Sequence, residues 1–304
     1  MSAPQILLVA GTHGNELNAP WLFDQWDTYP ELIDKKELEV FSIIGNPLAR
    51  KECVRYIDFD LNRSFTDEII SSSDAKSAEA LRAKEILSLY GPKGEHPCQI
   101  ALDFHTTTSS MGSSLVVYGR RPADLALAAL IQFRLGLPIY LHEGDSNQNG
   151  FLVESWQCGL VIEIGPVPQS LIDNKIVNQN LLILQTLIDE IRKVKLGLAT
   201  FPDIVIIHKH LYSIDYPRDK NGVISAFIHP YLINKDWERI KKGQYLFLDL
   251  DGNEQVANSE DYCVPVFINE ASYVEKNIAM SLTKKEVWTF KDEWANAIQA
   301  LTND

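Results

Sequence analysis

Short apolar runs alternate with helical patterns along the first two thirds of the chain. The apolar runs predict strands over residues 5–10, 38–44, 98–104, 114–118 and 159–164. The helical patterns cover residues 74–90, 122–135 and 170–196. This alternation predicts an α/β fold in which a mostly parallel sheet is flanked by helices.

The pattern changes after Phe201-Pro202, where short β-rich runs are separated by turn residues at 219–222 and 251–252. We therefore expect residues 1–200 to form an α/β domain and residues 201–304 to form a smaller, mostly antiparallel β-rich domain. No internal repeat or obvious linker separates these segments in the sequence. The two domains are expected to pack together.

Composition and charge exclude several classes of protein. With 45% hydrophobic and 23% charged residues, the chain is typical of a globular protein. No apolar run approaches the roughly 20 residues of a membrane-spanning helix, and the N-terminus lacks a basic leader. Four scattered cysteines without a CxxC pair argue against a disulfide framework. A cytoplasmic location is expected.

The net charge of -13 argues against nucleic acid as a partner, because phosphate binding depends on Lys and Arg. No membrane partner is expected either, and a homo-oligomer remains open. An anionic substrate would need locally clustered cations to counter the negative field of the chain. Clustered arginines are therefore informative in this sequence.

Polar residues that follow the predicted strands are candidate ligands, since open α/β sheets bind ligands beyond the carboxyl ends of their strands. His13 and Glu16 follow the first strand, and His105 follows a later one. Two imidazoles and one carboxylate leave zinc an open position for water, which is the ligand count of catalytic sites. The His-x-x-Glu pair alone is a weak signal. Asp103 either orients a histidine ligand or caps a backbone group.

Glu163 lies within the apolar run 160–164, where an unpaired carboxylate is costly. It is expected either to carry protons during a reaction or to form a buried ion pair with an arginine. Arg55, Asn62 and Arg63 occupy one short polar stretch. Such arginines either fix a carboxylate and polarise a carbonyl, or are solvated surface residues.

Other histidines carry weaker signals. His208 and His210 alternate on one run and could share a face, but surface histidines are commoner than second metal sites. His142-Glu143 lacks the second histidine of an HExxH helix. The absence of GxSxG, P-loop and GxGxxG motifs excludes the usual serine hydrolase and nucleotide-binding interpretations.

Several ordered sequence blocks resemble the aspartoacylases, a branch of the aspartoacylase and succinylglutamate desuccinylase family related to zinc carboxypeptidases. The resemblance covers nearly the full length. The matching blocks are residues 11–16, 46–47, 55–58, 60–63, 103–109, 162–166, 215–219, 228–230 and 269–276.

The resemblance implies a zinc carboxypeptidase-like fold with one zinc ion per subunit, bound by His13, Glu16 and His105. It implies that Glu163 is the general base and acid, and that Arg55 polarises the scissile carbonyl, both next to the substrate. The implied activity is hydrolysis of an N-acyl-L-aspartate, with N-acetyl-aspartate as the leading substrate. The alternatives are other N-acyl amino acids, aromatic or S-conjugated, and a metal-binding relative without activity.

The resemblance also implies that Asn62 and Arg63 hold a substrate carboxylate and that Tyr273 closes the pocket from the second domain. One departure concerns the substrate side chain. Acylaspartate-specific relatives carry an arginine and a tyrosine at positions that match Val153 and Asn149 here. Asn149 belongs to the polar segment 144–150, which we expect to be a mobile loop. Loss of the arginine removes a charged hydrogen bond of about 1.5 to 3 kcal/mol.

Overall fold

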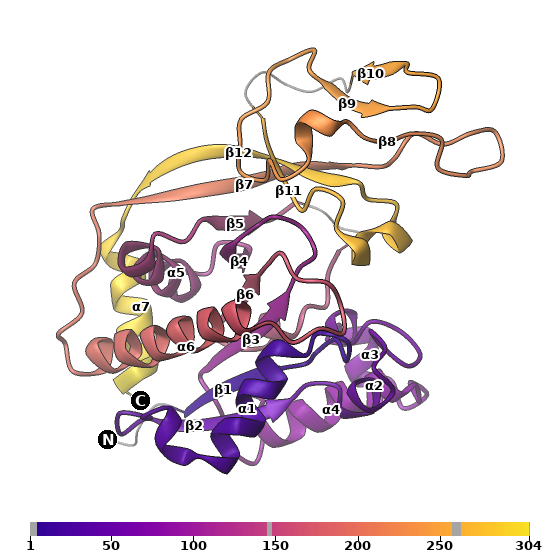
Figure 1. The fold of residues 1–304 in the computed structure, drawn as a ribbon. Coiled ribbons are helices and arrows are strands. Elements are labelled where there is room, and N and C mark those ends of the chain that lie inside the picture. The colour runs from indigo at the N-terminus through magenta and orange to yellow at the C-terminus, as the bar shows by residue number, and fades with distance from the viewer. Residues whose placement is uncertain (1–4, 145–147, 257–262, 304) are drawn as a thin grey trace.

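The computed structural model describes residues 5–144, 148–256 and 263–303. Residues 145–147, the centre of the expected loop 144–150, lie outside the described residues. A nine-stranded sheet forms the centre of the molecule (Figure 1). Its strands, in spatial order, are β11 (Val264–Val266), β12 (Met280–Thr289), β7 (Ile204–Ile214), β5 (Ile139–His142), β4 (Ser113–Tyr118), β6 (Cys158–Ile164), β3 (Ile100–Thr106), β1 (Gln5–Ala10) and β2 (Glu39–Ile44).

The sheet is mostly parallel, as the sequence predicts. The pairs β1–β2, β1–β3, β3–β6, β4–β5 and β5–β7 are parallel. The pairs β4–β6, β7–β12 and β11–β12 are antiparallel. The expected α/β class, with helices around the sheet and an antiparallel β-rich C-terminal part, is confirmed.

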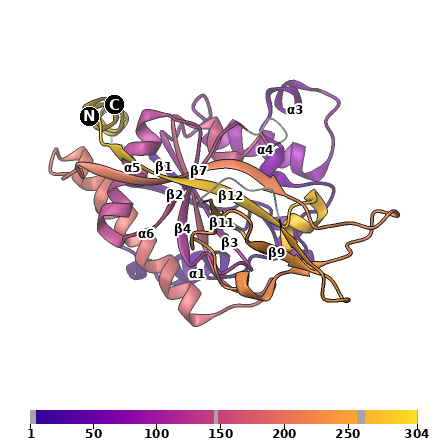
Figure 2. The ribbon, with the colours of Figure 1, turned by 90° about the horizontal axis from the view of Figure 1, so that it is seen from above.

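Helices cover both faces of the sheet (Figure 2). One face packs against α1 (Asn18–Thr28), α5 (Pro122–Leu135), α6 (Asn174–Lys195) and α7 (Asp292–Asn303). The other face packs against α4 (Ala78–Tyr90), with α2 (Pro47–Glu52) and α3 (Asp67–Ser71) beside it. The short 3-10 helices are η1 (Pro30–Leu32), η2 (Leu61–Arg63), η3 (Leu152–Ser155), η4 (Pro230–Leu232) and η5 (Ala271–Lys276).

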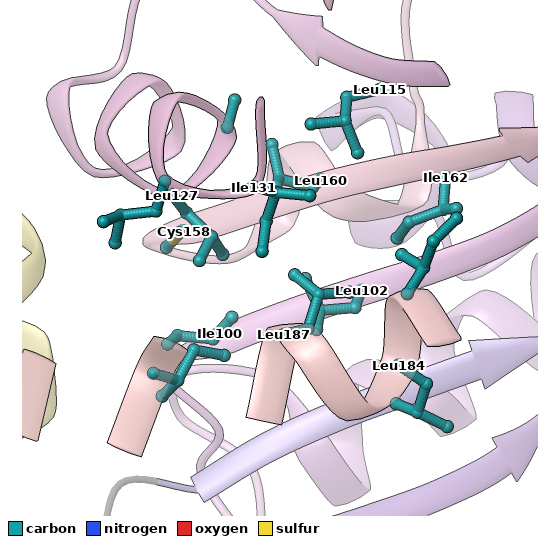
Figure 3. Close-up of a cluster of buried hydrophobic side chains, with 14 of the residues drawn as sticks. Ile100, Leu102, Leu115, Leu127, Ile131, Cys158, Leu160, Ile162, Leu184 and Leu187 are labelled. Carbon is teal, nitrogen blue, oxygen red and sulfur yellow. The ribbon is translucent and has the colours of Figure 1, made fainter. Parts of the chain in front are cut away.

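The core on the α5 and α6 side is built from alternate strand positions, because successive side chains of a strand point to opposite faces. Leu102 of β3 and Leu160 of β6 face Ile131 of α5 and Leu187 of α6, and all four are fully buried (Figure 3). Burying one such side chain contributes about 1.5 to 3 kcal/mol. This packing fixes the strands whose carboxyl ends carry the candidate site.

Two predicted helices begin and end close to the expected residues because their capping signals are local. Helix α5 begins at Pro122 and ends at Gly136, which has a positive φ of 70° that suits a residue without a Cβ. Helix α6 begins at the Asp173 cap, whose side chain accepts a hydrogen bond from the Ile176 amide. Of the helices in residues 5–144, 148–256 and 263–303, none has both the length and the apolar character needed to cross a bilayer.

The region after residue 200 contributes to two sheets. Strands β7, β12 and β11 extend the large sheet, and α7 packs against α5 and α6. A separate three-stranded sheet contains β10 (Glu254–Val256), β9 (Tyr245–Leu248) and β8 (Phe227–Ile228) (Figure 1). The predicted turn between β9 and β10 is present, and Gly252 adopts a φ of 84° there. The division of the chain into domains at residue 200 remains a prediction.

Candidate metal centre and substrate pocket

The candidate site lies at the carboxyl ends of three adjacent parallel strands, β1, β3 and β6. His13 and Glu16 lie on the loop after β1, His105 is near the end of β3, and Glu163 is near the end of β6. Because these strands are neighbours, residues separated by up to 150 positions in the sequence meet at one edge of the sheet.

His13, Glu16 and His105 are buried, and their ligand atoms lie within 4.8 Å of one another. The Nδ1 atom of His13 lies 2.6 Å from Oε1 of Glu16 and 3.1 Å from Nδ1 of His105. The Nδ1 atom of His105 is 3.1 Å from Oε2 of Glu16. The three residues that the sequence nominated as ligands are therefore brought together.

The far nitrogen of each imidazole contacts a buried aspartate. Nε2 of His13 lies 3.0 Å from Oδ1 of Asp60, and Nε2 of His105 lies 2.8 Å from Oδ2 of Asp103. Carboxylates accept hydrogen bonds, so in a neutral imidazole the proton is held at Nε2 and the Nδ1 lone pair faces inward. Two lone pairs and the carboxylate of Glu16 then converge. A cation at their centre would relieve the electrostatic repulsion between these acceptors.

The same contacts shift the pKa values of these groups. Burial raises the pKa of Glu16, but His13 and His105 outweigh burial and lower the pKa overall. Burial lowers the pKa of His105, but the carboxylates of Asp103 and Glu16 outweigh it and raise this pKa well above its usual range. A proton or a metal ion is thus strongly favoured among these side chains.

Glu163 lies opposite His105 in the register of β3 and β6. Burial, with smaller contributions from Glu16 and Glu270, raises the pKa of Glu163 to about 8, although His105 and Arg55 lower it. Across the described ranges, no arginine forms an ion pair with Glu163, so the alternative of a buried salt bridge is not supported. This carboxyl group can exchange a proton near neutral pH.

Arg55 belongs to a charged cluster beside the ligand group. Its guanidinium lies 3.3 Å from Oδ2 of Asp60 and 3.6 Å from Oε1 of Glu16. Its Nε atom is buried and has no hydrogen-bond partner among the residues that the structure describes. Nζ of Lys276 lies 3.2 Å from the same Oδ2 of Asp60. Asp60 therefore holds two cations and His13 together.

Asn62 and Arg63 occupy η2, whose first turn is fixed by Asp60: its Oδ1 accepts a hydrogen bond from the Asn62 amide at 2.9 Å. The Asn62 Oδ1 atom accepts from the Leu152 amide at 2.7 Å, which orients the side chain. The Arg63 guanidinium lies 4.0 Å over the Phe151 ring. In the described parts of the chain, Arg63 has no carboxylate partner.

The C-terminal region reaches the site through η5, which carries Tyr273. Glu270 caps η5, and its buried carboxylate also accepts hydrogen bonds from the backbone amides of Thr108 at 2.8 Å and Ser109 at 3.2 Å. The Thr107 hydroxyl donates to the same oxygen. This carboxylate therefore fastens η5 to the loop that follows β3.

Two adjoining cavities surround these residues. The inner cavity has a volume of about 40 Å³, and the outer cavity has a volume of about 700 Å³. All eight residues that the sequence nominated line the inner cavity: His13, Glu16, Arg55, Asn62, Arg63, His105, Glu163 and Tyr273. Aromatic and apolar side chains complete its wall: Tyr118, Phe151, Val161 and Phe267.

Sequence reasoning missed three residues of this site, namely Asp60, Glu270 and Lys276. Glu270 and Lys276 line the inner cavity, and Asp60 contacts its cations and His13. All three lie within sequence blocks that resemble the family, and this was the signal available in the sequence. Their roles depend on contacts between distant segments, which no local pattern reveals.

Val153 supplies no group to either cavity. Its side chain is 0% exposed and packs in the core beneath the site, while its carbonyl accepts a hydrogen bond from Arg121 at 3.2 Å. Asn149 lines the outer cavity instead. The position that the family resemblance matches to an arginine is therefore a core position in this chain.

The other histidines form aromatic contacts. The ring of His208 packs edge-on against Trp237 at 4.9 Å. The rings of His142 and His210 are 5.2 Å apart, and the Tyr140 hydroxyl lies 2.9 Å from Nδ1 of His210. Within the described residues these histidines form no group of three ligand donors.

The fold and the site together define an α/β protein with a candidate metal centre at the carboxyl edge of its sheet. The sequence model of the succinylglutamate desuccinylase/aspartoacylase catalytic domain matches residues 2–191. The model of the AstE/AspA barrel-sandwich hybrid domain matches residues 203–285. The chain belongs to the succinylglutamate desuccinylase/aspartoacylase family, as its sequence blocks indicate.

Individual relatives cover all or nearly all of the chain. A protein of Prochlorococcus marinus named probable aspartoacylase is 55% identical over 306 residues, covering 100% of both chains. A probable aspartoacylase of a Synechococcus species is 51% identical over 301 residues, covering 99% of both. Among solved structures, murine aminoacylase 3 has a TM-score of 0.86 and 27% identity, covering 95% of this chain and 98% of that chain.

Proposed function

We propose that the protein is a zinc-dependent deacylase that hydrolyses N-acyl-L-aspartate, with N-acetyl-aspartate as the leading substrate, to a carboxylate and L-aspartate. The observation that carries the proposal is the convergence of His13, Glu16 and His105 beside Glu163, a carboxyl group whose pKa is raised to about 8. The relatives named probable aspartoacylase support the same reaction class.

The donor set fits zinc. Two imidazole nitrogens and one carboxylate are a common catalytic ligand set for this ion, and the aspartates behind His13 and His105 fix the inward-facing nitrogens. The chemistry that zinc supplies when bound is Lewis-acid activation of a water nucleophile and of the amide carbonyl.

Glu163 carries the proton in this proposal. One proton passes from the attacking water to a carboxylate oxygen of Glu163, and then to the amide nitrogen as the C–N bond breaks. The water oxygen becomes part of the released carboxylate, and L-aspartate leaves as the amine. Arg55, held by Asp60 and Glu16, stabilises the negative charge that develops on the carbonyl oxygen.

Asn62 and Arg63 hold the substrate α-carboxylate. Arg63 suits this role because it is a cation without a carboxylate partner in the residues described, and a planar guanidinium binds a carboxylate at two points. Tyr273 of η5 lines the same cavity and closes the pocket in this proposal. The narrow inner cavity favours a small acyl group over a peptide.

A second candidate substrate class is N-acyl amino acids with aromatic side chains. Two observations favour it: Val153 brings no cation to the pocket, and the inner cavity is lined by Tyr118, Phe151 and Phe267. The murine structural relative is named an aminoacylase.

The test is hydrolysis of a panel of N-acetyl amino acids at equal concentration by purified zinc-loaded protein. The panel contains N-acetyl-aspartate, N-acetyl-glutamate, N-acetyl-alanine and N-acetyl-tyrosine. The proposal predicts the highest kcat/KM for N-acetyl-aspartate, and a preference for N-acetyl-tyrosine selects the second class. If no substrate is hydrolysed while His105→Ala loses the zinc that the wild type binds, the protein is a metal binder without activity.

A further inference from the structure

We propose that Lys276 binds the side-chain carboxylate of a dicarboxylic N-acyl amino acid, and thereby sets the substrate class of the site. The inference rests on the proposed function and names a residue that acts within it. Lys276 is the last residue of η5, so it comes from the same segment as Tyr273.

Lys276 lies where the two cavities meet. Among the described residues, Lys276 and Arg63 are shared between the linings of the inner and outer cavities. A substrate whose scissile amide lies beside Glu163 must project its amino acid side chain toward this neck, because the inner cavity has a volume of only about 40 Å³. The neck, meaning the junction of the two cavities at Arg63 and Lys276, is therefore the place where the substrate side chain is bound.

The charges around Lys276 favour an additional anion. The carboxylate of its neighbour Asp60 also contacts Arg55 and His13. This one carboxylate therefore faces two cations and an imidazole. Burial and the nearby guanidinium of Arg63 lower the pKa of Lys276 to about 8, although Asp60 raises it. A substrate carboxylate at the neck would stabilise the ammonium group and relieve its repulsion from Arg63.

The other cations of the inner cavity have different partners. Arg55 lies beside Glu16 and Asp60, close to the ligand group, and Arg63 extends along Phe151 next to Asn62. Val153 is buried away from the pocket, so no arginine at that position serves the side chain. Lys276 is thus the cation that the described lining offers to a second carboxylate.

The experiment compares Lys276→Met and Lys276→Arg with the wild type, all loaded with zinc. N-acetyl-aspartate and N-acetyl-alanine are the substrates, because they differ by the side-chain carboxylate. Lys276→Met is expected to lower kcat/KM for N-acetyl-aspartate roughly 10- to 100-fold more than for N-acetyl-alanine. Lys276→Arg keeps the charge and is expected to recover most of this difference. Lys235→Met, at an exposed lysine paired with Glu238, is the matched control.

A second readout measures binding without turnover. Calorimetric titration of both N-acetyl amino acids into zinc-loaded Glu163→Gln, with and without Lys276→Met, is expected to show weaker binding of N-acetyl-aspartate alone. An equal loss for both ligands would assign Lys276 a structural role through Asp60, and no loss would remove it from the site; either result overturns the inference. If the wild type hydrolyses neither substrate, the proposed function fails, while the titration still decides the role of Lys276.

Discussion

His105 of β3 and Glu163 of β6 are direct partners in the register of two adjacent parallel strands. Side chains at paired positions project from the same face of a sheet, so the candidate proton carrier is held beside a candidate ligand by strand pairing. The strands also contribute Leu102 and Leu160 to the buried core. A site built on such rigid elements holds its geometry more closely than one built on loops.

Glu163→Gln tests the role of this carboxyl group. The amide is close in size to the carboxyl group but cannot exchange the proton, so kcat is expected to fall roughly 100- to 10,000-fold. Zinc content should remain at the wild-type level, because Glu163 is outside the ligand group. Kinetics with N-acetyl-aspartate and metal analysis by mass spectrometry check both expectations. Retained turnover would assign the proton transfer to another group.

Asp103→Asn tests the orientation of His105. The substitution removes the charge that faces Nε2 of His105 at 2.8 Å, and zinc affinity is expected to fall roughly 10- to 100-fold. Competition with a chromophoric chelator measures the affinity. Thr12→Val is the matched control, because it removes only the hydrogen bond to Asp103 and should have a smaller effect. Equal zinc affinity in Asp103→Asn and the wild type would contradict the role.

The ligand group could be predicted from the sequence because it follows a general rule of parallel sheets. His13, Glu16 and His105 each follow or end an apolar run, and the carboxyl ends of parallel strands meet. The contacts of Asp60 with His13 and Lys276 could not be predicted in this way. They depend on the path of irregular loops, for which the sequence has no periodic signal.

In the fold, too, some elements could be predicted from local sequence signals and others could not. Helix α5 has Pro122 at its start and Gly136 at its end, so its bounds were predicted closely. Strand β5 has four residues, Ile139–His142, which is too short for a periodic pattern, and it was missed. Helix α7 is absent from the expected helices, although Asp292 and Glu293 open it and its buried residues Trp294 and Ile298 recur at helical spacing.

Glu270→Ala tests the attachment of η5 to the loop after β3. Glu270 is 4% exposed, and its removal leaves the amides of part-buried Thr108 and buried Ser109 without their acceptor. We expect the free energy of unfolding to fall by roughly 2 to 4 kcal/mol and KM to rise, because η5 carries Tyr273 and Lys276. Urea unfolding and steady-state kinetics measure these changes. Glu275→Ala, on the exposed side of η5, should cost less than about 1 kcal/mol.

From the raised pKa of Asp124 we expect the free energy of unfolding to depend on pH, independently of the candidate site. Burial raises the pKa of Asp124 from 3.8 to about 6, against the opposing effects of Arg121 and the Gly159 amide. Because the folded pKa exceeds the unfolded one, its stabilising contribution is fully present below pH 3.8 and is lost as the pH rises through about 6. Relative to Asp124→Asn, the metal-free wild type should therefore lose up to about 3 kcal/mol between pH 4 and 7.5.

Urea unfolding of the metal-free wild type and Asp124→Asn at several pH values measures this difference. The carboxyl group titrates whereas the asparagine amide does not, so the gap in unfolding free energy between the two proteins should change progressively between about pH 4 and about pH 6, with half of the change complete by about pH 5. Asp251→Asn, at an exposed turn, controls for the loss of one negative charge. A gap that stays constant from pH 4 to 7.5 would mean that Arg121 keeps Asp124 ionised throughout, and that their ion pair outweighs burial.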